Sequence, residues 1–269
     1  MSRDVYLVLL EFGRQHEQRA IELLIPTLQR VFPDAILRGA IVDNALADHA
    51  ELAIDHRLHR VSGDNTMREF SGWDRGIAWV ERRYTPAPDA IFVLANDTVV
   101  RAEKFERVRD IPVDRVEAAW RGALVGYVEA YPRPVELFGL SLRQWVDTSL
   151  VIAARPTLAA LRPFARPFAD EELFADDWRR LFREPSPLSE NYRAYLKTWL
   201  FGERIDGEFR HSWHAQEPLT ESNVDASKAK LRSLLCEHLL SARARARGIP
   251  LVDIRPQPLA IDPFERVAS

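Results

Sequence analysis

Hydrophobic residues in the first half of the chain form short continuous runs that alternate with stretches of helical spacing. Residues 5–10, 35–42 and 90–94 are mainly apolar, as a strand buried on both faces of a parallel sheet requires. Residues 20–31 and 71–83 instead carry apolar side chains three and four positions apart, which is typical of helices. This alternation predicts an α/β fold with a mostly parallel sheet flanked by helices, as in Rossmann-like proteins.

The second half of the chain has a different pattern. Two further strands are predicted near residues 121–127 and 147–153, separated by a loop that contains prolines. After residue 155 the pattern becomes mainly helical. We therefore expect a sheet-containing core over residues 1–155 and a mainly helical C-terminal extension over residues 156–269. The helical stretches of the extension are predicted at residues 157–163, 168–183, 189–202 and 226–247.

Composition and charge narrow the class of protein only a little. The 269 residues are 46% hydrophobic and carry a net charge of −3, so bulk charge predicts no nucleic-acid partner. The single cysteine, Cys236, excludes a disulfide within the chain and fits a reducing compartment. The apolar run at residues 5–10 is too short for a signal peptide or a membrane span. We expect a cytoplasmic protein with no integral membrane segment, and the sequence leaves its oligomeric state open.

Polar residues follow the predicted strands at three places. The first strand end is Ile-Val-Asp-Asn at residues 41–44, and another is Leu-Ala-Asn-Asp-Thr at residues 94–98. Between them, residues 65–77 form a loop that leads into a helix. Ligands bind beyond the carboxyl ends of the strands in such sheets, so these segments are candidates for one site. Each strand end taken singly is also explained by a turn, which favours Asp and Asn.

In their order and spacing, these segments resemble the nucleotide-binding half of the GT-A glycosyltransferases, specifically the inverting enzymes of family 2. The Arg-Glu-Phe sequence at residues 68–70 is similar to that of the rhamnan-synthesis type. The resemblance covers about residues 4–130. It implies a GT-A fold and hexosyl or deoxyhexosyl transfer from a nucleotide-sugar to an acceptor hydroxyl. The implied setting is bacterial polysaccharide or surface glycan synthesis, with a glycan or lipid-linked glycan acceptor at the inner membrane face.

The resemblance also implies which residues bind the donor. Asp43 corresponds to the carboxylate that accepts a hydrogen bond from the nucleotide base, and Phe12 borders the same pocket. Asp74 corresponds to a polar position near the ribose or the sugar. The residues implied to bind the nucleotide-sugar are Phe12, Asp43, Asn44, Asp74, Arg75 and Asn96.

A divalent cation is the implied cofactor. Asp97 matches the last acid of the family's DxD motif, which holds Mg²⁺ or Mn²⁺ against the diphosphate of the donor. The first DxD position is Ala95 and the middle one is Asn96, so this chain departs from the motif. A site without metal, in which Arg75 or Arg101 contacts the phosphates, is the alternative.

An inverting transferase needs a base for the acceptor hydroxyl. Glu190 resembles the first acid of the family's Glu-Asp pair, with Asn191 in place of the second, and Asp177 is another candidate. Acids at the start of a helix also interact favourably with its dipole without any catalytic role. Trp145 and Asp147 precede a predicted strand where such enzymes bind the acceptor, although a tryptophan at this place is also expected in a core.

A second hypothesis is a non-catalytic GT-A-like domain that binds a glycan or a partner enzyme. The departures from the DxD motif and from the acidic pair motivate it. His211 and His214 have a spacing that allows metal binding on a helix, but no cysteine or acidic cluster adjoins them, so we expect a surface loop there.

Overall fold

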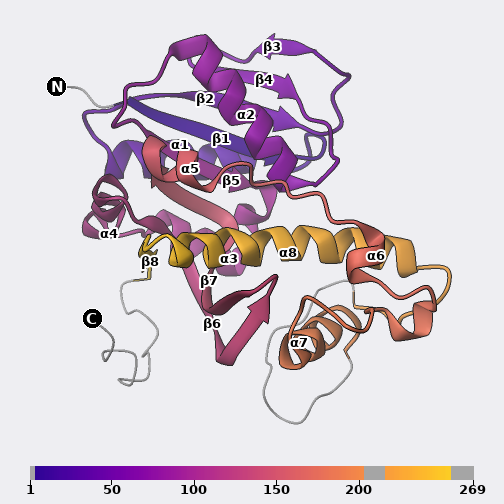
Figure 1. Cartoon of the computed structure of the whole chain (residues 1–269). Coiled ribbons are helices and arrows are strands. Elements are labelled where there is room, and N and C mark those ends of the chain that lie inside the picture. Colours follow the sequence, from indigo (N-terminus) through magenta and orange to yellow (C-terminus); the bar gives the residue numbers. More distant parts are fainter. Residues whose placement is uncertain (1–3, 203–215, 256–269) are drawn as a thin grey trace.

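The computed structural model describes residues 4–202 and 216–255, and its centre is one eight-stranded mixed sheet (Figure 1). The strands are β1 (Asp4–Glu11), β2 (Ile36–Asp43), β3 (Glu51–Ala53), β4 (Leu58–Ser62), β5 (Ile91–Asn96), β6 (Leu124–Leu137), β7 (Leu140–Ala154) and β8 (Leu251–Asp253). Their order across the sheet is β3-β4-β2-β1-β5-β7-β6-β8. The predicted α/β fold with a flanked, mostly parallel sheet is confirmed, and the arrangement is consistent with a Rossmann-like fold.

The helices cover both faces of this sheet. The α-helices are α1 (Glu17–Val31), α2 (Glu69–Tyr84), α3 (Ala102–Arg109), α4 (Val113–Glu117), α5 (Arg155–Leu161), α6 (Asp170–Leu173), α7 (Glu190–Phe201) and α8 (Val224–Ala246). The 3-10 turns are η1 (Asp97–Val100), η2 (Ala118–Arg121) and η3 (Trp178–Arg180). One core cluster joins α1, α3 and α4 to one face, and the other joins α2, α5, α7 and α8 to the opposite face.

The four strands β4, β2, β1 and β5 are parallel and end at the same edge. We call this the carboxyl edge of the sheet. Its register places Glu11 beside Asp43, and Leu10 beside Asn96. The side chains of residues 5–9 in the central strand β1 have no solvent exposure, which is why that run is apolar without alternation.

The two strands predicted at residues 121–127 and 147–153 are parts of one long hairpin, which corrects the loop expected between them. β6 and β7 are antiparallel and continue beyond the carboxyl edge (Figure 1). The prolines fit because the pairing shifts between Ala130 and Val135, where Pro132 and Pro134 need no ladder hydrogen bond.

The predicted helix at residues 168–183 is also wrong, because only α6 and η3 form there. The Asp177 side chain accepts a hydrogen bond from the Arg179 amide, and the chain turns back so that Phe174 pairs with Phe182. The other three helices predicted for residues 156–269 form close to their expected bounds. In the described ranges no helix is both long and apolar enough to cross a membrane.

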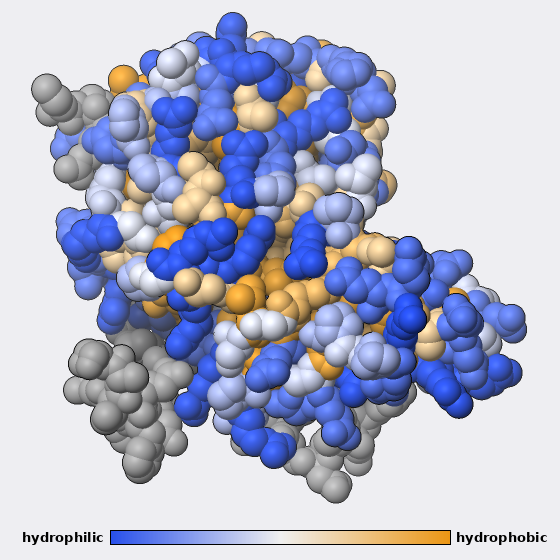
Figure 2. All heavy atoms as spheres, in the orientation of Figure 1, coloured by the Kyte–Doolittle hydropathy of each residue, from blue (hydrophilic) through white to orange (hydrophobic). Residues whose placement is uncertain are grey.

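Helix α8 joins the C-terminal part to the sheet. It packs against β7, and in Figure 1 it crosses the molecule between α2 and the β6–β7 hairpin. On the face drawn in Figure 2, hydrophobic side chains gather in the middle of the molecule, where α8 crosses, and polar side chains surround them.

Two glycines set the distance between α2 and the sheet. A Cβ atom at Gly72 would lie 2.0 Å from Leu10 Cδ1, and one at Gly76 would lie 2.4 Å from Val8 Cγ1 and 2.7 Å from Val42 Cγ2. The Gly-Trp-Asp-Arg-Gly sequence therefore has a packing role: it lets the helix backbone rest on β1 and β2. Trp73, between the glycines, donates from Nε1 to the Ala95 carbonyl of β5 at 3.1 Å.

Gly76→Val should destabilise the protein by about 2 kcal/mol or more, since overpacking against Val8 and Val42 outweighs the small gain in helix propensity when glycine is replaced. Urea unfolding followed by circular dichroism measures this change. Arg82→Val is the matched control, because Arg82 is exposed on the same helix. An equal loss of stability in both variants would show that the close helix–sheet contact is unimportant.

Candidate functional site

The loop after β1 brings two predicted site residues together at the carboxyl edge. The Gly13 amide donates to Asp43 Oδ1 at 3.1 Å, and the backbone N–H of Phe12 donates to the Asp97 carboxylate. Asp43 and Asp97 therefore flank two consecutive residues of one loop. The Phe12 side chain is 65% exposed, which makes it a large apolar surface beside both carboxylates.

Asn44 and Arg75 lie at the same edge, near the end of β4. Asn44 Nδ2 donates to Asn65 Oδ1 at 3.2 Å, and a Cβ atom at Gly63 would meet Asn44 Oδ1 at 1.8 Å. Arg75 donates to Ser62 Oγ at 3.1 Å. Glycine at position 63 thus leaves room for the Asn44 side chain between the two loops. These contacts order the loops next to Asp43, whose Oδ1 also accepts from the Ala45 amide at 2.8 Å.

Asp74 has a different neighbourhood. Its carboxylate accepts from Arg162 Nε at 3.2 Å and from the amides of Phe164 and Ala165 at 2.8 and 3.0 Å. The side chain thus ties α2 to the segment after α5. The structure thus places Asp43 and Asp97 beside the same loop, whereas Asp74 forms its hydrogen bonds with the segment after α5.

At the DxD position, the Asn96 side chain forms hydrogen bonds with the backbone of neighbouring segments. Asn96 Nδ2 donates to the Thr148 carbonyl at 3.0 Å, and Asn96 Oδ1 accepts from the Thr98 amide at 3.0 Å. Ala95 has no side-chain donor atom, so Asp97 is the one carboxylate of the motif. Burial raises the pKa of Asp97, although the nearby His16 and Arg101 act in the opposite direction. This donor set does not fit the two-carboxylate metal site that the resemblance implies, and no group of three metal-ligating side chains occurs in the part of the chain that the structure describes.

A cavity of about 320 Å³ opens next to Asp97, between the start of α1 and η1. Two arginines, Arg19 and Arg101, give it positive charge. No side chain caps the start of α1, and the first-turn amides of a helix add positive potential. His16 and Arg19 were missed from the sequence, although their place directly after β1 was a usable signal. The cavity is lined by His16, Arg19, Asp97, Thr98, Val100 and Arg101.

A buried carboxyl group lies behind this loop. Glu11, at the end of β1, is 1% exposed, and its Oε1 is 3.7 Å from Arg60 Nε. Burial raises the pKa of Glu11 to about 9, with the neighbouring Glu17 and Asp43 acting in the same direction. Arg60 also binds Glu17 at the start of α1, with Nε 3.1 Å from Oε2. Glu11 is thus a neutral carboxyl group near pH 7, beside the ion pair of Arg60 and Glu17.

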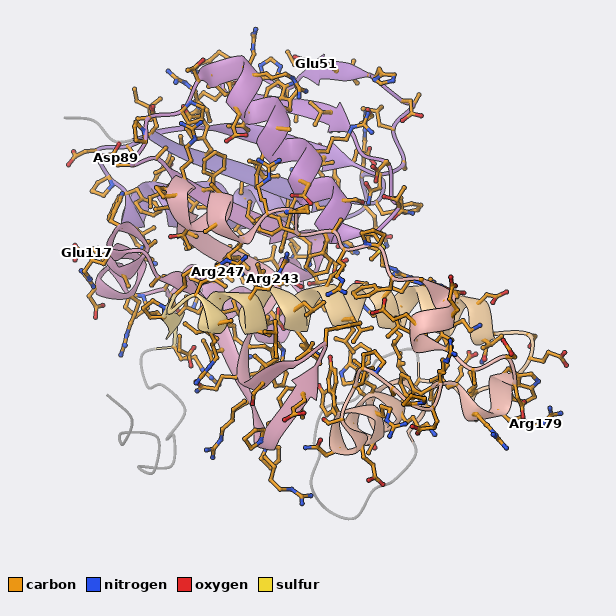
Figure 3. All side chains as sticks on the ribbon, viewed as in Figure 1. Glu51, Asp89, Glu117, Arg179, Arg243 and Arg247 are labelled. Carbon is orange, nitrogen blue, oxygen red and sulfur yellow. The ribbon has the colours of Figure 1, made fainter. Side chains whose placement is uncertain are left out.

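The two predicted catalytic bases lie elsewhere. Glu190 is exposed at the start of α7, where the preceding Ser189 amide donates to the Glu136 carbonyl at 2.9 Å. Glu136 pairs with Ser141, which is nine residues along β7 from Leu150, or about 30 Å at about 3.3 Å per residue. Asp177 is exposed beside Arg179, and Figure 3 shows Arg179 at the far end of the molecule. The structure does not bring these acids to the carboxyl edge.

Trp145 and Asp147, predicted to bind the acceptor, are both in the hairpin. Trp145 is 5% exposed, and its ring lies 4.3 Å from that of Tyr131 and 4.9 Å from that of His238. It is a core residue with its ring covered. Asp147 is bound through both oxygens by Lys104 Nζ, at 3.0 and 2.8 Å. Burial opposes ionisation of Asp147, but Lys104 lowers its pKa overall.

One more acidic residue, Glu237 on α8, approaches the carboxyl edge from the second half of the chain. Its Oε2 accepts hydrogen bonds from the hydroxyl and the amide of Thr148, the residue whose carbonyl binds Asn96. Nothing in the helical pattern of residues 226–247 distinguishes it from a surface glutamate, so the sequence carried no signal for it. His211 and His214 lie outside the described residues.

Comparison with known proteins yields no relative: no protein-family model matches the chain, and no curated protein matches it.

Glu11→Gln should make the protein more stable at pH 8 than the wild type, by on the order of 1–3 kcal/mol, and should change little at pH 5. The raised pKa means that folding keeps a proton which the unfolded chain releases above about 4.5, so wild-type stability falls as the pH rises from 4.5 towards 9. Glutamine keeps the size of the side chain but does not ionise, so it removes this dependence. Urea unfolding at both pH values measures it.

The control for Glu11→Gln is Glu117→Gln, because Glu117 is exposed at the surface (Figure 3). Equal pH dependence of stability in Glu11→Gln and the wild type would contradict a buried neutral carboxyl at position 11.

Proposed function

We propose that this protein is an inverting glycosyltransferase with a GT-A fold, which transfers a sugar from a nucleotide-sugar to an acceptor hydroxyl. The observation that carries the proposal is the loop at Phe12 and Gly13, whose two amides bind the Asp97 and Asp43 carboxylates at the carboxyl edge. Ligands of doubly wound sheets bind at this edge. Phe12 offers an exposed ring for stacking against a base, and Asp43 is the acceptor for a base N–H.

The diphosphate of the donor is assigned to the adjacent cavity. The side chains of Arg19 and Arg101, together with a ring N–H of His16, can bind phosphate oxygens, and arginine does so with two parallel hydrogen bonds. Fixed positive groups there also stabilise the charge that develops on the leaving nucleoside diphosphate. The acceptor is a glycan or a lipid-linked glycan, and the reaction belongs to surface glycan synthesis on the cytoplasmic side of the membrane.

A divalent cation, Mg²⁺ or Mn²⁺, would bind Asp97, the one carboxylate of the motif. The donor phosphates would then contact both the cation and the side chains that line the cavity. Ala95 has no side-chain oxygen, and both polar atoms of the Asn96 side chain already form hydrogen bonds. We therefore favour Arg19 and Arg101, rather than Arg75 or a metal ion, as the main source of positive charge beside the diphosphate.

Arg19→Gln should weaken binding of nucleoside diphosphates about tenfold, since one charge-assisted contact to phosphate is lost. Titration calorimetry with uridine, guanosine and thymidine diphosphates measures the dissociation constants. Arg179→Gln is the matched control, because Arg179 is exposed at the far end of the molecule (Figure 3). Wild-type protein that binds none of these diphosphates would remove the donor site from the proposal.

Sugar transfer should continue in EDTA, with a loss of less than about threefold, because protein cations take the role of a bound metal. The rate is measured with and without EDTA, followed by addition of Mg²⁺ or Mn²⁺. Abolished transfer that either cation restores would instead establish a metal site at Asp97.

A non-catalytic domain that binds a glycan or a partner enzyme is the second candidate. The structural use of both Asn96 side-chain atoms favours it, because the DxD position is then a support for β7 rather than a reaction centre. Hydrolysis of the donor without acceptor distinguishes the two: an active transferase cleaves nucleotide-sugars slowly into sugar and diphosphate, and a binding domain leaves them intact.

A further inference from the structure

The Glu237 carboxyl group is held at the carboxyl edge by a short chain of hydrogen bonds. Its Oε2 accepts from Thr148, the Thr148 carbonyl accepts from Asn96 Nδ2 at 3.0 Å, and Asn96 directly precedes Asp97. The Glu237 side chain is 16% exposed, so the group is partly buried but still reaches solvent. Helix α8 thus presents one carboxyl group next to the strand end where the donor diphosphate is proposed to bind.

Glu69, at the start of α2, lies near both this group and Asp97. Its Oε1 accepts from Ser233 Oγ at 3.2 Å, and Ser233 lies one helical turn before Glu237 on α8. Besides burial, the Glu69 charge raises the pKa of both Asp97 and Glu237, so it lies near both groups. The groups around Glu237 come from several elements. They are Glu69 on α2, Lys104 on α3, Tyr131 on β6, Asp147 on β7, Tyr192 and Tyr195 on α7, and His238 on α8.

These surroundings suit a base that works near neutral pH. Burial raises the pKa of Glu237 to about 7, and the negative charge of Asp147 acts in the same direction. A catalytic base is most effective when its pKa is close to the working pH. Asp147 itself is held ionised by Lys104, and His238 is neutral because burial lowers its pKa to about 3. Glu237 is therefore the group of this cluster that can exchange a proton at pH 7.

We propose that Glu237 is the general base that deprotonates the acceptor hydroxyl, in place of Glu190 and Asp177; this assignment rests on the proposed glycosyltransferase function. The acceptor oxygen forms a bond to the anomeric carbon of the donor, and its proton passes to a Glu237 oxygen. The bond from the anomeric carbon to the phosphate oxygen breaks, and its electron pair leaves with the nucleoside diphosphate. The protonated Glu237 then releases its proton to solvent.

The test compares three glutamate variants of the full chain, once screening has identified a nucleotide-sugar and an acceptor that the wild type uses. Glu237→Gln should lower kcat by about a hundredfold or more while nucleoside diphosphate binding stays within about twofold. Glu221→Gln is the matched control on an exposed glutamate and should be unchanged. Glu190→Gln tests the competing base. Glutamine is isosteric and still contacts Thr148, and thermal unfolding checks that each variant is folded.

The pH profile separates a base from a merely structural residue. Wild-type kcat should fall below about pH 7 as Glu237 becomes protonated, whereas the residual activity of Glu237→Gln should lack this fall. Glu237→Asp should recover part of the rate. Wild-type turnover in Glu237→Gln, or loss of transfer in Glu190→Gln alone, would overturn the assignment while the glycosyltransferase function stands. Wild-type protein that neither binds nor cleaves any nucleotide-sugar would overturn both.

Discussion

The common register of the four parallel strands β4, β2, β1 and β5 decides which side chains meet at the carboxyl edge. Residues 5–9 of β1 are fully buried, so polar groups are confined to the strand ends and to the loops that follow them. Because β1, β2, β4 and β5 end together, Glu11, Asp43, Ser62 and Asn96 are brought to one edge. The glycines of α2 belong to the same arrangement, since they allow the helix to cover these strands closely enough to exclude water.

Charge is distributed unevenly along this edge. Glu11 is neutral because it is buried beside other acids, Asp147 is ionised because Lys104 binds both of its oxygens, and Glu237 lies between these extremes. Carboxyl groups of one chemical type thus differ in proton affinity through burial and neighbouring charge alone. Carboxyl groups with shifted pKa values are common at functional sites. Their presence here supports a functional site at this edge independently of any family resemblance.

Much of the N-terminal half could be predicted from the sequence, and the site only in part. The continuous apolar runs specified the central strands, and the Asp and Asn residues that follow them marked the carboxyl edge. The roles of Asp74 and Trp145 could not be predicted in this way. A carboxylate that binds Arg162 and a tryptophan that packs on His238 depend on segments about 90 residues away in the chain, which local pattern does not encode.

Sequence pattern alone specified the central strands, the longer helices and the polar strand ends, because these depend on the hydrophobicity and turn preferences of neighbouring residues. Tertiary structure decided which acids meet. It carried Glu190 to the distant end of the hairpin and brought Glu237, from a helix with no distinguishing motif, to Thr148 of β7, which is hydrogen-bonded to the last residue of β5. The reason is physical: hydrogen bonding and desolvation act over a few ångströms in space, and only the folded chain determines which groups lie within that range.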